Sequence, residues 1–112
     1  AVYHGQIEVV RFLVEAGADT NRVTDHGATP LHLAAYNGQI DVVRFLVEVH
    51  GGMDKSANDG ATPLCLAAYN GQIDVVRFLV EASADTNKAM DDGATPMYLA
   101  AQNGQIDMNK GV

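Results

Sequence analysis

The chain has 112 residues, the size of one domain, and 47% of them are hydrophobic, which excludes a disordered chain. Its formal net charge is −7, and its seven basic residues are scattered along the sequence. Nucleic acids and anionic membrane surfaces bind clustered Lys and Arg, so we expect neither as a partner. A partner attracted by charge would carry a basic or polar surface.

The sequence contains no signal for a membrane or for secretion. No apolar run approaches the ~20 residues that a membrane helix requires. The first residues lack the basic flank and apolar core of a secretory signal. The single cysteine, Cys65, cannot form an internal disulfide, as is typical of a reducing compartment. We therefore expect an intracellular, cytoplasmic protein.

A repeat with a period of 33 residues organises the sequence. The motif Gly-Ala-Thr-Pro begins at Gly27 and returns at Gly60 and Gly93, each 33 positions further on. Residues 27–48 and 60–81 match at every position but one. We therefore predict one domain, residues 1–112, built from repeated units. These are a partial unit at 1–26, full units at 27–59 and 60–92, and a partial unit at 93–112.

Each unit is predicted to contain two short helices. Thr29 is a good N-cap, and Pro30 suits the first helical position because its missing N–H is not needed there. Gly38 can end this helix in a left-handed conformation. The second helix is predicted from about Ile40 to Glu48, and it is too apolar to be solvated on all sides. We assign to helix ends and turns the glycines that repeat the spacing of Gly38, namely Gly5, Gly71 and Gly104.

Arginine and glutamate recur four residues apart on the second helices. Such a spacing places the two side chains on one face, where an ion pair adds at most about 0.5 kcal/mol. We expect exposed ion pairs at Arg11–Glu15, Arg44–Glu48 and Arg77–Glu81.

The end of the second helix differs between units. Gly17 can form a left-handed turn, but the equivalent residues are His50 and Ser83. A non-glycine residue in that conformation costs on the order of 1 kcal/mol. We expect this strain at Ser83, whereas at His50 the following Gly51 and Gly52 can take the turn instead.

Several parts of the unit resemble the ankyrin repeat. They are the run Gly27-Ala28-Thr29-Pro30-Leu31-His32-Leu33-Ala34-Ala35, then Gly38, Val42-Val43 and Phe45-Leu46. The stretch Ala16-Gly17-Ala18-Asp19-Thr20-Asn21 is similar to the closing turn of that family. The resemblance covers nearly the whole chain. It implies an all-α solenoid of stacked helix-turn-helix units with short β-hairpin-like fingers.

The resemblance also implies a structural histidine. In the family, this histidine bonds the threonine hydroxyl and ties adjacent units together. Thr29 and His32 keep that pair, but Cys65 and Tyr98 occupy the equivalent positions of the later units. We therefore expect His32 to be structural rather than a metal ligand, Cys65 to be a small core residue, and the later units to lose some stability.

No motif for catalysis or cofactor binding is present. The histidines and Cys65 lack the paired spacing of metal sites, and neither a Gly-x-Ser-x-Gly elbow nor a phosphate-binding loop occurs. The carboxylates Asp91 and Asp92 fall in a finger tip, where a solvated turn explains them. We therefore predict no catalytic, metal or cofactor site, and no enzymatic activity.

The resemblance implies that a partner docks on the concave side, on the finger tips and first helices. We call the matching positions the recognition stripe: Val23, Asp25, His26, Tyr36, Asn37, Ser56, Asn58, Asp59, Tyr69, Asn70, Ala89, Asp91, Asp92, Gln102 and Asn103. The fingers vary while the framework repeats, which fits either adaptable recognition or drift in unconstrained turns. Tyr36 and Tyr69 are the best anchor candidates, although tyrosines that only pack unit on unit would look alike.

We predict a protein–protein interaction module. The alternative is a structural spacer segment of a longer array, with no dedicated partner. Because the first partial unit has little of a first helix and the last has little of a second, two copies could stack end to end, each completing the other. Frayed ends are the simpler alternative.

Overall fold

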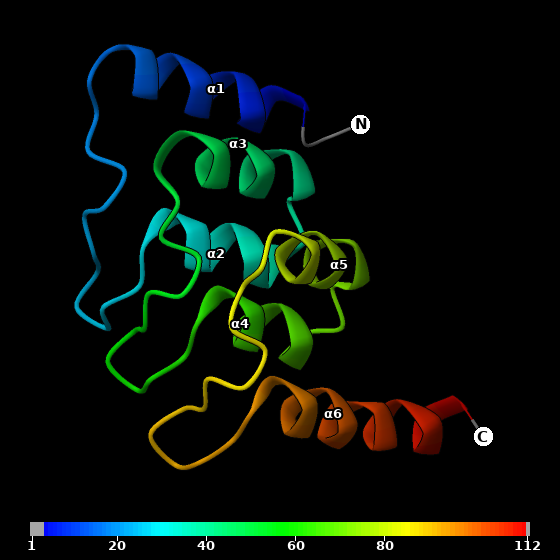
Figure 1. Cartoon of the computed structure of the whole chain (residues 1–112). Helices are drawn as coiled ribbons and strands as arrows, with labels where there is room; N and C mark the ends of the chain where they lie inside the picture. Colours follow the sequence, from blue (N-terminus) through cyan, green and yellow to red (C-terminus); the bar gives the residue numbers. More distant parts are fainter. Residues whose placement is uncertain (1–3, 112) are drawn as a thin grey trace.

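The computed structural model describes the backbone of residues 4–111 and the side chains of residues 5–104. Six helices and no strands run through this part of the chain (Figure 1). They are α1 (His4–Glu15), α2 (Pro30–Asn37), α3 (Ile40–His50), α4 (Pro63–Tyr69), α5 (Ile73–Glu81) and α6 (Pro96–Gly111). The predicted all-α repeat fold is confirmed.

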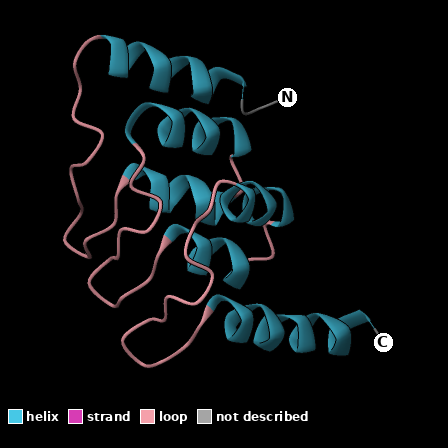
Figure 2. Cartoon of the chain, in the orientation of Figure 1, coloured by secondary structure: helices cyan, strands magenta, loops and turns pink. Residues whose placement is uncertain are grey.

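The helices form two rows. The first row is α2, α4 and α6, packed in succession, and the second row is α1, α3 and α5. Helix α2 also packs on α3, and α4 packs on α5, so the rows are joined within the units. Three long loops lie together on one side of the stack, and we call them finger 1 (16–29), finger 2 (51–62) and finger 3 (82–95) (Figure 2). None of the described helices has the length and hydropathy to cross a bilayer.

The predicted signals set the ends of the first-row helices. The Thr29 hydroxyl accepts a hydrogen bond from the His32 amide at 3.3 Å, and Pro30 is the first residue of α2. Gly38 ends the helix with a φ of 74°, and its N–H caps the carbonyls of the last turn. The Thr62 hydroxyl repeats the cap in α4. The residues at the helix boundaries therefore decide where α2 and α4 begin and where α2 ends.

Gly5 and Gly104 behave differently from the prediction, because each lies inside a helix and ends none. The turn at Gly38 is held by the next unit, where Asn70 and Gln72 both donate to the Tyr36 carbonyl. Beyond Gly104 the sequence lacks the apolar Val-Val-x-Phe-Leu pattern that would pack a returning helix. Without that packing, glycine at this spacing does not interrupt the helical ladder.

The second-row helices end as the glycine pattern predicts. Helix α3 continues two residues beyond Glu48 to His50, and Gly51 then takes a φ of 70°. After α5 no glycine is available, and Ser83 adopts a φ of 75°, the one positive value among the described non-glycine residues. The expected strain is therefore present at Ser83 and relieved after His50.

The predicted ion pairs are wrong. Among the described side chains none of the three pairs forms; instead Arg11 lies over the Phe45 ring at 5.0 Å from its centroid, and Arg44 lies over Phe78 at 5.2 Å. An arginine that precedes glutamate by four residues is the weaker orientation of such a pair. A guanidinium over a ring gains about 0.5–1 kcal/mol at an exposed site, so the phenylalanine of the next unit competes successfully.

The fingers are joined by backbone hydrogen bonds. Each is closed across its tip, by Thr24 N–H to Ala28 O, Ala57 N–H to Ala61 O, and Met90 N–H to Ala94 O. Neighbouring fingers are then linked, because Asn58 N–H donates to His26 O and Asp91 N–H donates to Asp59 O, both at 2.9 Å. A Cβ added to Gly60 would lie 2.6 Å from the Asp91 amide nitrogen, whereas one added to Gly93 would meet open space.

We predict that Gly60→Ala lowers the free energy of unfolding more than Gly93→Ala does. Both glycines have positive φ, so each substitution costs about 1–2 kcal/mol of backbone strain. Gly60→Ala must also displace finger 3, at an additional cost of about 1–3 kcal/mol. Urea denaturation of the two variants in dilute solution measures the difference, and equal losses would contradict the account.

We predict that Ser83→Gly raises the free energy of unfolding by about 0.5–1 kcal/mol, because relief of the left-handed strain exceeds the entropic cost of glycine. The control is Ala82→Gly, at a φ of −83°, where no strain exists to relieve and stability should fall. The measurement is the denaturation midpoint, and a loss of stability in both variants would show that Ser83 is not strained.

Candidate functional site

The fold places the recognition stripe along the finger side of the stack and the first-row helices. Most of its side chains are exposed, while Ser56, Ala89 and Asn103 are half-buried. Tyr36 and Tyr69 occupy the same position on the successive helices α2 and α4, and both are exposed. The predicted positions are therefore accessible on neighbouring units.

Three asparagines of the stripe have structural roles that the sequence did not predict. Asn58 Nδ2 donates to Asp25 O and Asn70 Nδ2 donates to Tyr36 O, each at 2.9 Å. Asn103 Nδ2 donates to Tyr69 O in the same way. Each bond joins one unit to the next, so substitution of these residues changes stability as well as any contact with a partner.

Two aspartates of the stripe also serve their own turns. The Asp59 carboxylate accepts from Ala61 N–H, and the Asp92 carboxylate accepts from Ala94 N–H, both at 3.0 Å. Such side-chain-to-backbone bonds stabilise tight turns. The side chains of Tyr36 and Tyr69 take no part in these networks, which makes the tyrosines the cleaner probes of binding.

An apolar groove lies beside Tyr36, between finger 1 and helices α2 and α4. It encloses about 400 Å³ and is lined by Arg22, Thr24, Ala28, Thr29, Pro30, His32, Leu33, Tyr36 and Leu66. Leu33 is 61% exposed, a large fraction for a leucine. Leu33 was not predicted as a binding residue, because it was expected to belong to the apolar face of the first helix. Its spacing of three residues from Tyr36 was the available signal, since that spacing puts both on one helical face.

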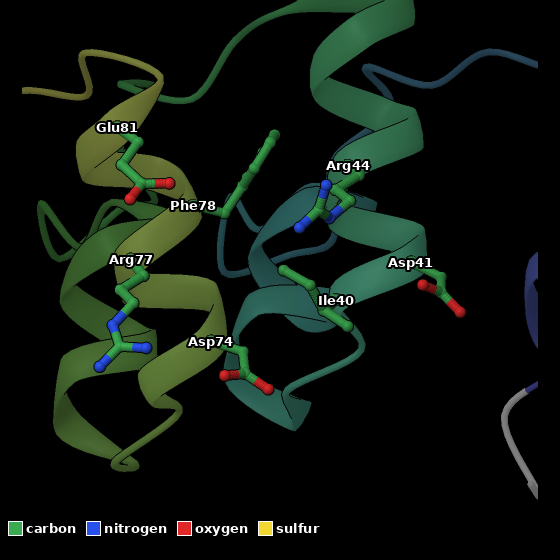
Figure 3. Close-up of a pocket in the computed structure, with 7 residues that line it drawn as sticks. All are labelled: Ile40, Asp41, Arg44, Asp74, Arg77, Phe78 and Glu81. Carbon is green, nitrogen blue, oxygen red and sulfur yellow. The ribbon is translucent and has the colours of Figure 1, made fainter.

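A second groove lies between α3 and α5 and has a different chemistry (Figure 3). It encloses about 510 Å³ and is lined by Ile40, Asp41, Arg44, Asp74, Arg77, Phe78 and Glu81. Arg44 faces the Phe78 ring from α3, while Asp74, Arg77 and Glu81 line up along α5. The charges are mixed and largely compensate, so this groove presents no single sign of charge to a ligand.

His32 ties one unit to the next, as expected. It is fully buried, and its Nε2 lies 3.0 Å from the Ala61 carbonyl oxygen of the next unit. A carbonyl only accepts, so Nε2 carries the proton and Nδ1 is an acceptor. Nδ1 accordingly accepts from the Thr29 hydroxyl at 2.8 Å and from the Thr29 amide at 3.1 Å. Burial lowers the pKa of His32 below its ordinary value of 6.5, because the charged ring would lose its hydration.

The later units have weaker ties or none of this kind. Cys65 is fully buried, as predicted, and its Sγ–H donates to the Lys88 carbonyl at 3.6 Å. A thiol is a weaker donor than an imidazole N–H. Tyr98, at the third equivalent position, is exposed. The described residues contain no group of three His, Cys, Asp or Glu side chains placed to hold a metal ion.

We predict that His32 makes stability fall on acidification. Above pH 6.5 both the folded and the unfolded chain hold His32 neutral, and its contribution is complete. As the pH falls below 6.5 the unfolded chain takes up the proton first, so the free energy of unfolding drops by up to about 1.4 kcal/mol per pH unit.

The matched control is His32→Cys, which copies the residue at position 65. The stability difference between the native chain and this variant should shrink between neutral pH and about pH 5. Chemical denaturation at several pH values measures it. A difference independent of pH would mean that His32 is not held neutral.

Comparison with known proteins agrees with this geometry. A family model described as ankyrin repeats, in three copies, matches residues 1–59 and 49–110. No curated protein matches the chain. The family match includes both rows of helices and all three fingers.

Proposed function

The chain belongs to the ankyrin-repeat family, whose repeats are generally protein–protein interaction modules, and we propose that it binds a partner protein on the recognition stripe. The units that present the stripe are those proposed from the sequence period, the full units 27–59 and 60–92 and the flanking partial units. No enzymatic step is part of this proposal.

The observation that supports it is the apolar groove beside an exposed aromatic residue. Leu33 and Tyr36 lie on one face of α2, and Leu66 of α4 completes the groove. Large apolar side chains that stay exposed next to a hollow are typical of binding sites, because a partner side chain can be desolvated there. An apolar anchor from the partner fits the groove itself.

The surroundings of the groove define the rest of the partner. Asp25, Asp59, Asp91 and Asp92 are exposed along the finger tips. A basic or polar surface would complement these carboxylates, mainly by speeding association and fixing orientation. The proposed partner therefore combines one apolar anchor with flanking basic or polar residues.

We predict that Tyr36→Ala combined with Tyr69→Ala removes the partner while the fold persists. Loss of two aromatic contacts at a hot spot costs on the order of 2 kcal/mol or more in binding. The experiment compares proteins retained from a cell extract by the native chain and by the variant, with circular dichroism to check folding. The control is Val49→Ala with Val80→Ala, exposed apolar residues of the second row.

Two outcomes would contradict the proposal. Proteins retained equally by all three chains would show that the stripe is not the binding surface. A double variant that loses stability rather than a partner would show that the tyrosines only pack unit on unit.

The alternative function is a structural segment of a longer array that associates end to end. One specific observation favours it: the outer faces of α1 and α6 expose apolar residues at positions that are buried in the middle of the stack. This alternative is tested with variants on the outer faces of α1 and α6, none of which alters Tyr36 or a residue that lines the groove, so the two functions can be tested separately.

A further inference from the structure

Helix α1 exposes an apolar face, whereas the same face of the equivalent interior helix α3 is covered. Phe12 is 70% exposed and Val9 is 54% exposed, although Val42, the equivalent of Val9, is only 5% exposed. Leu13 is likewise exposed, whereas the equivalent Leu46 is buried. Residues of the same type are therefore buried on the interior helix α3 but exposed on α1.

Helix α6 shows the same contrast at the opposite end. Met97 is 78% exposed, and its equivalent Leu64 is 2% exposed. Ala100 and Ala101 are exposed, although the matching alanines of α2 and α4 are buried. Small residues at these positions allow a neighbouring helix to approach closely in the interior, and the surface they offer on α6 is the same.

The two exposed faces complement each other. In the interior, each first-row helix packs on the second-row helix that follows it, as α2 packs on α3 and α4 on α5. Helix α6 is a first-row helix that packs mainly on α4, and α1 is a second-row helix that packs mainly on α3. Each therefore presents the face that the other kind of helix covers.

We propose that a second copy of this chain stacks on the first, with its α1 placed against α5 and α6 in the register of the interior units. The proposal deepens the end-to-end alternative given above, and the variants that test it alter neither Tyr36 nor Tyr69. Such a contact joins two different surfaces, so it can add further copies in one direction.

The arginine–phenylalanine contacts fix the register. Arg11 lies over Phe45 and Arg44 lies over Phe78, so each guanidinium meets the ring of the following unit. The next arginine in this series is Arg77, and the sequence position that would supply its ring is Gly111. Phe12 of the second copy occupies that place in the proposed stack. A contact already made twice inside the chain would thus be made once more between copies.

The fingers support the same register. A Cβ on Gly27 or Gly60 would collide with the following finger, whereas Gly93 faces open space. In the proposed stack, finger 1 of the second copy fills this space. Its Asp25 N–H would donate to Asp92 O, which continues the series Asn58 to His26 and Asp91 to Asp59.

The test uses two variants that each block one face. Phe12→Asp places a charge on the α1 face and Met97→Asp places one on the α6 face; both side chains are highly exposed, so the single chain should keep its fold. Light scattering across a wide concentration range should show the native mass rising above 11.9 kDa. Each variant alone should stay at 11.9 kDa.

Mixing the two variants decides the geometry. Phe12→Asp keeps a native α6 face and Met97→Asp keeps a native α1 face, so an equal mixture should form a complex of twice 11.9 kDa and nothing larger. A mixture that stays monomeric while the native chain associates would overturn the head-to-tail register. A native chain that stays at 11.9 kDa throughout would overturn the association itself.

Two arginine variants test the register of the proposed stack. Arg77→Ala should weaken self-association about two- to fivefold, the effect of losing one cation–π contact. Arg44→Ala should leave association unchanged, because its ring lies within the same chain. Equal effects of the two substitutions would overturn the Arg77–Phe12 contact. Because none of these variants alters Tyr36 or Tyr69, failure here is distinguishable from failure of partner binding.

Discussion

Burial between neighbouring units is the constraint on which this structure depends. Helices α2 and α4 have eight and seven residues, too few to be stable alone in water. Val43, Val75 and Leu79 are fully buried, and they lie on helices α3 and α5, which pack on helices of their own unit and of neighbouring units. The fold is therefore a chain of nearest-neighbour contacts, and stability belongs to the junctions rather than to the helices.

The sequence predicted the helix ends and turns, because these depend on residues that are close together in the chain. The Thr29 cap, the Gly38 end and the strain at Ser83 follow from backbone preferences that act within a few residues. Gly104 could not be assigned in this way, because the turn needs packing from a returning helix as well as a glycine. The partner of Arg44 was also missed, since the competing Phe78 ring lies in the next unit and only the stack brings it close.

The candidate site was predictable to a similar extent. Period and resemblance located exposed positions on successive units, such as Tyr36 and Tyr69. They did not separate contact residues from framework residues, and Asn70 proved to bond the preceding unit. Leu33 was overlooked because an unchanging leucine is normally read as core. Only the packing shows that this leucine borders a groove instead.

The contacts that join neighbouring units differ between the α2–α4 and the α4–α6 junctions. The α2–α4 junction has the buried His32 bond, while the α4–α6 junction has the thiol bond of Cys65 and a small separate cluster of Ala61, Ala94 and Leu99. Local opening in a repeat stack spreads from its weakest junction. Because a thiol is a weaker donor than an imidazole N–H, we expect the α4–α6 junction to open more readily than the α2–α4 junction that His32 holds.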